Sequence, residues 1–188
     1  MKTRIKVGGG VIIFAVFLLL GGHRYIDIQV VFPWLSAAVT HELGHFAAAR
    51  LCGAEIEKMT FDVVGARMSL SGKLLSYGEE IFIAAAGPAV NFALAGLLFP
   101  VFSDFADFSI MLGILNLIPA PSFDGYRILC SVLSKYTDTV KGESVMKILS
   151  FFALFLLWLI AVYALLRYRA SFSLFIISCA LFARFLCK

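Results

Sequence analysis

The sequence predicts an all-α polytopic membrane protein with about six transmembrane helices, a small membrane-associated β-hairpin between the second and third, and a broken fourth helix. Of its 188 residues, 61% are hydrophobic and 15% are charged, whereas soluble domains are about half apolar and about a quarter charged. Apolar segments long enough to cross a bilayer recur along the chain. Lys and Arg flank these segments instead of gathering on one face, so we expect a lipid bilayer and no nucleic acid as partner.

The first two spans are predicted over residues 5–22 and 27–51. The first is an apolar run that follows a basic start and lacks a clear cleavage site, so an uncleaved helix is favoured over a signal peptide. Gly53 follows the end of the second span and stops it, because glycine commonly terminates helices.

Residues 54–76 alternate between polar and apolar side chains, which predicts two or three short strands. A solvated linker is the alternative. Ser76 and Glu79 have the spacing of a capping box, so the third helix is expected over residues 77–99.

The fourth span follows an acidic loop at 103–107 and covers about residues 108–134. Two prolines and a glycine interrupt it between 116 and 125. Inside a membrane, such breaks persist only where the backbone is buried in protein or lines a wet cavity. We therefore expect Asp124, which lies in the break, at an interior site.

The last two spans are predicted over residues 146–166 and 171–187, after a hydrophilic loop at 135–147. The chain is interpreted as one domain over 1–188, with a core at 27–134 and accessory helices at 5–22, 146–166 and 171–187. The distribution of Lys and Arg predicts a multi-pass protein of the cell membrane with a cytoplasmic N-terminus.

The residues His41, Glu42 and His45 carry the strongest chemical signal. On a helix, two histidines four residues apart share a face and can bind one metal, and the glutamate between them can act as general base. Ionisable groups within an apolar span are costly and usually functional. A catalytic zinc keeps three protein ligands, and Asp124 is the remaining acid in a membrane segment. We therefore expect one Zn²⁺ per chain, held by His41, His45 and Asp124, with Glu42 as the catalytic base.

Asn91 and Asn116 are asparagines within the apolar segments of the core. Either could support substrate or a developing oxyanion. The alternative is that they join packed helices by hydrogen bonds. For Asp124 the corresponding alternative is an ordinary Asp-Gly turn.

Three segments together resemble the site-2 protease family of intramembrane zinc metalloproteases (peptidase family M50). The stretch His41 to His45 resembles the family's H-E-x-x-H helix, and residues 86–91 resemble its A-G-P-x-x-N segment. Asn116-x-x-Pro119, leading to Asp124-Gly125, resembles its N-x-x-P…D-G segment, which carries the third zinc ligand. The second glycine of the family's P-L-D-G-G pattern is replaced here by Tyr126. The six-span layout is similar to the sporulation-type branch.

The resemblance implies an endopeptidase that cleaves a membrane-associated or membrane-tethered protein, such as a transcription-factor precursor, near the cytoplasmic side. Its regulators would be separate membrane proteins. The alternative is a proteolytically silent homologue that binds and regulates a membrane partner, against which Glu42 argues. A transporter is disfavoured, because transporters tend to show paired broken helices and internal repeats.

Overall fold

The computed structural model describes residues 4–7, 27–62, 65–71, 74–121, 123–137, 139–168 and 172–186. The chain is mostly helical. It divides into two compact units, residues 1–116 and 117–188, and each is described by itself.

The first unit packs three helices, α2 (Ile28–Leu51), α3 (Tyr77–Leu98) and α4 (Ser103–Asn116). Their contact surfaces are lined by small side chains. A methyl group added to Gly44 of α2 would lie 2.8 Å from the Ala86 carbonyl oxygen of α3, and one added to Gly113 of α4 would lie 2.9 Å from the Phe92 ring. The helix backbones can therefore approach closely, as small residues allow in membrane helices.

The termini of α2 and α3 follow from the local sequence. The Asp27 carboxylate accepts a hydrogen bond from the backbone N–H of Gln29 at 2.9 Å and caps the start of α2. Gly53, at φ 72°, turns the chain after its end. At the start of α3, the Ser76 hydroxyl and the Glu79 carboxylate each accept from the other's backbone N–H, which confirms the predicted capping box.

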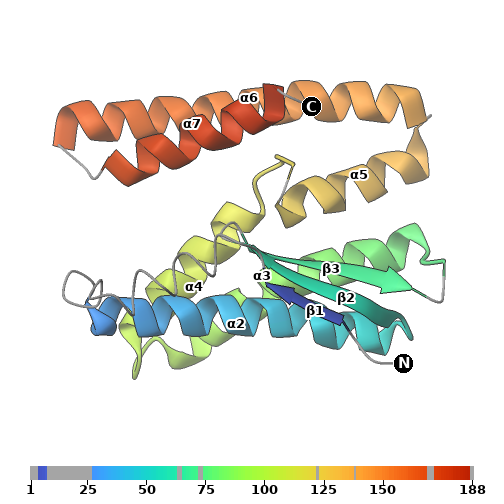
Figure 1. The fold of residues 1–188 in the computed structure, drawn as a ribbon, viewed down its shortest axis with the longest axis horizontal. Coiled ribbons are helices and arrows are strands. Elements are labelled where there is room, and N and C mark those ends of the chain that lie inside the picture. Colours follow the sequence, from blue (N-terminus) through green and yellow to red (C-terminus); the bar gives the residue numbers. More distant parts are fainter. Residues whose placement is uncertain are drawn as a thin grey trace. The chain divides into compact units, whose positions relative to one another are not determined.

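A three-stranded sheet joins the first unit, in the order β1 (Arg4–Val7), β2 (Glu55–Asp62), β3 (Gly65–Ser71) (Figure 1). β1 pairs with β2 in parallel, and β2 pairs with β3 in antiparallel. The association of this sheet with the membrane stays a prediction.

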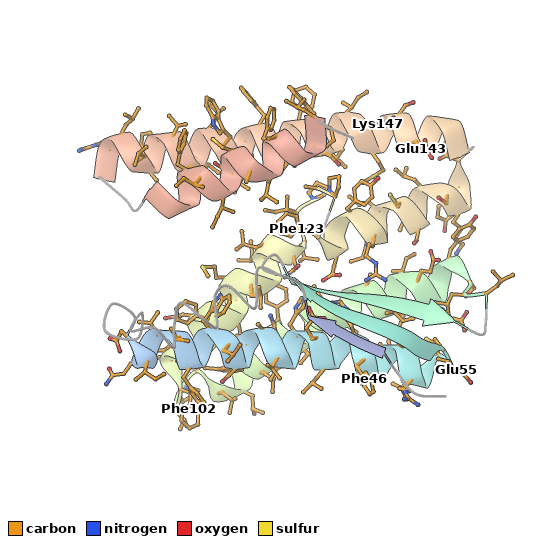
Figure 2. All side chains as sticks on the ribbon, viewed as in Figure 1. Phe46, Glu55, Phe102, Phe123, Glu143 and Lys147 are labelled. Carbon is orange, nitrogen blue, oxygen red and sulfur yellow. The ribbon has the colours of Figure 1, made fainter. Side chains whose placement is uncertain are left out.

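The second unit contains α5 (Asp124–Tyr136), α6 (Thr139–Tyr168) and α7 (Phe172–Leu186). α6 and α7 lie side by side (Figure 1), and Phe151 of α6 meets Phe182 of α7 with ring centroids 5.6 Å apart. Figure 2 shows Glu143 and Lys147 on the first turns of α6, before its long apolar stretch begins.

Three local predictions were wrong. Residues 5–7 belong to strand β1, where they pair with β2, and the rest of the predicted first span lies outside the described residues. The acidic stretch 103–107 is the first part of α4. A negative side chain such as Asp104 in a first turn interacts favourably with the helix dipole. Residues 139–145 of the predicted hydrophilic loop already belong to α6.

Within the described residues, two helices are long and apolar enough to cross a membrane, Tyr77–Leu98 and Gly142–Arg167. α2 has 24 residues, but its polar side chains lower its hydropathy. The predicted number of about six spans is therefore not confirmed.

Candidate metal centre

The two histidines of α2 lie together in the interior of the first unit. His41 and His45 are one helical turn apart and both are buried. Their rings meet edge to face, with centroids 4.7 Å apart, and their Nε2 atoms are 3.1 Å apart. Two nitrogens bound to one tetrahedral zinc at about 2.0–2.1 Å would be about 3.3 Å apart. The observed pair is thus close to the spacing that a shared zinc requires.

A backbone carbonyl of α3 fixes the tautomer of the His45 ring. Nδ1 of His45 lies 2.7 Å from the carbonyl oxygen of Ile83. Because a carbonyl only accepts, Nδ1 must donate, and the neutral ring then carries its lone pair on Nε2. This nitrogen faces Nε2 of His41, so the pair needs either a proton or a cation between the two nitrogens. The donor set fits a metal ion, since a metal-binding histidine usually donates its other N–H to such an oxygen.

Gly87 of α3 forms the surface against which both rings lie. A methyl group added there would contact Nε2 of His45 and would lie 2.6 Å from Cε1 of His45 and 2.9 Å from Cε1 of His41. Real carbon–carbon contacts are about 3.5–4.0 Å. A glycine at this position is therefore what allows the imidazoles to occupy their places.

A small hydrophobic cluster lies close to the histidines, where α2 packs against α3. Ala48, Ala49 and Ala54 pack there with Ile83, the residue whose carbonyl accepts from His45. The orientation of the His45 ring is thus tied to the packing of the unit. Phe46 on α2, labelled in Figure 2, is only partly buried, unlike the neighbouring His45.

Glu42 is half-buried on α2, next to His41. Successive residues of a helix are about 100° apart around its axis, so the Glu42 side chain projects about a quarter turn away from that of His41. The role of Glu42 as a base stays a prediction.

Asn91 and Asn116 differ in their surroundings. Asn91, on α3, is completely buried, and within the described part of the chain neither its Nδ2 nor its Oδ1 has a hydrogen-bond partner. Asn116 ends α4, where its Nδ2 donates to the Leu112 carbonyl at 3.0 Å. The bond of Asn116 lies within its own helix, whereas the Asn91 amide has no hydrogen bond among the described residues. Both functional roles stay predictions.

Asp124 is the first residue of α5, in the second unit, and its side chain is buried. The segment before it folds back over this helix start. A methyl group on Gly125 would contact the Leu117 carbonyl and would lie 2.9 Å from the carbonyl oxygen of Ile118. The glycine after Asp124 therefore permits the break between α4 and α5. That Asp124 binds the same metal as the histidines stays a prediction.

Sequence reasoning missed the contributions of Ile83 and Gly87. The bond from His45 uses a backbone carbonyl, which any residue at position 83 would offer, so no sequence signal identifies it. Gly87 lies in the A-G-P-x-x-N segment, but its contact with the rings depends on how α2 and α3 pack.

The family model of peptidase family M50 matches residues 30–107 and 101–160, together more than half of the chain. A zinc metalloprotease of Methanocaldococcus jannaschii is 35% identical over 123 residues, which cover 58% of this chain and 35% of that protein. Rip3 of Mycobacterium tuberculosis, which carries a zinc-metalloprotease name, is 29% identical over 125 residues, 57% of this chain and 32% of that protein. This chain thus spans about a third of the length of these relatives.

The solved structure of a site-2 protease from Methanocaldococcus jannaschii is also similar. It matches with a TM-score of 0.69 and 25% sequence identity, over 97% of this chain and 88% of that one. The similarity in fold therefore extends beyond the region that the family model matches.

Proposed function

The chain belongs to peptidase family M50, and from this premise we propose that it is an intramembrane zinc endopeptidase that cleaves a membrane-associated protein. The observation that carries the proposal is the pair of buried Nε2 atoms 3.1 Å apart, with the Ile83 carbonyl fixing the tautomer of His45. Relatives named as zinc metalloproteases support zinc as the metal.

Three side chains would hold the zinc: His41, His45 and Asp124. Two neutral imidazoles and one carboxylate form a donor set typical of catalytic zinc, with a fourth position left for water. When bound, zinc supplies a Lewis acid that polarises the scissile carbonyl and makes water a nucleophile at neutral pH. The alternative of an ordinary Asp-Gly turn at Asp124 is tested by the zinc affinity of Asp124→Asn.

Glu42 carries the proton through the reaction in this proposal. Its carboxylate accepts a proton from the attacking water and returns it to the nitrogen of the leaving amine. The Asn91 amide, buried and without a partner among the described residues, would donate to the substrate backbone. Asn116 would be a second, weaker support, because its Nδ2 already serves the end of α4.

The substrate we propose is a membrane-tethered protein such as a transcription-factor precursor, cut near the cytoplasmic side. The Lys and Arg distribution supports a multi-pass protein with a cytoplasmic N-terminus. A helical substrate must unwind before hydrolysis, since its peptide groups are hydrogen-bonded. Among the described strands, β1 and β3 are the edges of the sheet, and an edge strand can hold an unwound segment by strand addition. The residues 1–188 would act as one protease domain, under separate regulatory membrane proteins.

The test is co-expression with a candidate membrane-tethered substrate, comparing the wild type with Glu42→Gln. We expect cleavage by the wild type only, while Glu42→Gln retains zinc. Equal cleavage by both would remove Glu42 as base. If the wild type binds the substrate and zinc without cleaving it, the silent-homologue alternative takes the place of the protease.

A further inference from the structure

An arginine pairs with the proposed carboxylate ligand inside the second unit. Nη1 of Arg127 lies 3.7 Å from Oδ1 of Asp124, three residues earlier on α5. The Asp124 side chain is 9% exposed, whereas that of Arg127 is 50% exposed. The spacing i, i+3 keeps both on one face of the helix. A half-exposed cation thus reaches inward to a buried carboxylate.

We infer that Arg127 is a positioning residue, which holds the Asp124 carboxylate in the orientation that binds metal. The inference rests on the proposed role of Asp124 as zinc ligand. A carboxylate has two oxygens, so Arg127 can hold Oδ1 while the group ligates through the other. Carboxylates that bind metals are usually held by such a second partner, and losing it costs about 10–100-fold in metal affinity or activity.

Asp124 lies in the first turn of α5, between Phe123 at the N-cap and Gly125. A negative side chain there interacts favourably with the helix N-terminus, and the ion pair with Arg127 adds a directed contact at Oδ1. Ion pairs between two exposed side chains contribute little. Here one partner is largely buried, so solvent screens the contact less than it screens a pair of exposed charges.

The experiment measures the zinc affinity of the full chain in detergent micelles, by competition with a chromogenic chelator. We expect Arg127→Ala to weaken zinc binding by about 10-fold and Arg127→Lys to recover part of that loss. Lys135→Ala is the matched control, because it removes a cation from the same helix. The Lys135 ammonium lies over the Tyr136 ring. The zinc affinity of Lys135→Ala should equal that of the wild type.

A double-mutant cycle separates this inference from the proposed function. If Arg127 acts through Asp124, then Arg127→Ala should add no further loss in the Asp124→Asn background. An additive loss, an unchanged affinity in Arg127→Ala, or an equal loss in Lys135→Ala would overturn the inference while leaving Asp124 as ligand. Unchanged affinity in Asp124→Asn would instead overturn the ligand assignment, and the inference with it.

Discussion

Replacing Gly87 with alanine tests the construction of the metal centre by adding a single methyl group. The added carbon would contact Nε2 of His45 and lie 2.6 Å from Cε1 of the same ring. That is about 1 Å shorter than an ordinary carbon–carbon contact. The His45 ring cannot easily move away, because its Nδ1 is bound to the Ile83 carbonyl at 2.7 Å. The methyl group must therefore displace the ring, the helix or both.

The expected effect is large for zinc and small for folding. Zinc sites tolerate deviations of about 0.2 Å in ligand distance, so a displacement of roughly 1 Å should lower zinc affinity by about 100-fold, the upper end of what loss of an outer partner costs. Overpacking costs about 1–3 kcal/mol, whereas alanine favours a helix interior over glycine by about 1 kcal/mol. The net loss of stability should therefore stay below about 2 kcal/mol.

Gly96→Ala provides the matched control on the same helix. A methyl group there would have no atom of the described residues within 4 Å, so it should leave zinc affinity and proteolysis unchanged. Zinc stoichiometry, chelator competition and substrate cleavage would be measured on both variants in detergent, with thermal unfolding as the check on folding. If Gly87→Ala keeps wild-type zinc affinity, the histidines are not held against α3 as described.

Three further predictions concern other elements. Asn91→Leu should lower the cleavage rate, yet raise the free energy of unfolding by about 1–3 kcal/mol, because it replaces a buried amide without a partner in the described structure. Cleavage kinetics and thermal unfolding would measure the two effects, and a less stable variant would contradict the prediction. Gly125→Ala should weaken zinc binding in chelator competition, because the added methyl group would push on the Leu117 carbonyl. Gly142→Ala is the control, since its methyl group would lie 3.7 Å from Cβ of Leu133, an ordinary contact. Equal zinc affinities of the two variants would refute the prediction. Ser76→Ala should destabilise the start of α3 by about 1 kcal/mol; faster amide exchange at residues 77–80 with unchanged cleavage would confirm it, and unchanged exchange would refute it.

Much of the histidine pair could be predicted from the sequence because it depends on helix geometry alone. The spacing from His41 to His45 places both rings on one face of any regular helix, and the structure has them 3.1 Å apart at Nε2. The hydrogen bond to Ile83 and the contact with Gly87 depend instead on two helices meeting at one register. The spacing of residues within either segment does not specify how the two helices align.

The errors in the fold have the same cause. Residues 5–7 continue into an apolar run, which favours a helix locally, but in the structure they form a strand that pairs in parallel with β2. Conversely, the acidic stretch 103–107 has the composition of a loop, yet Ala106 is buried within α4. For residues 5–7, pairing with β2 overrides the local preference. For residues 103–107, the burial of Ala106 and the place of Asp104 in a first turn both favour the helix.

The position of Asn91 relative to Gly87 gives the A-G-P-x-x-N segment a physical reading. The two residues are four apart on α3, so they lie on one face of the helix, the face that meets the histidine rings at Gly87. Hydrogen-bonding to a neighbouring helix would have given the amide a partner, but within the described residues it has none. A buried amide in this state costs about 1–3 kcal/mol. Selection for stability alone would favour an apolar residue there, so we expect the amide to be satisfied when an unwound substrate backbone enters beside the metal.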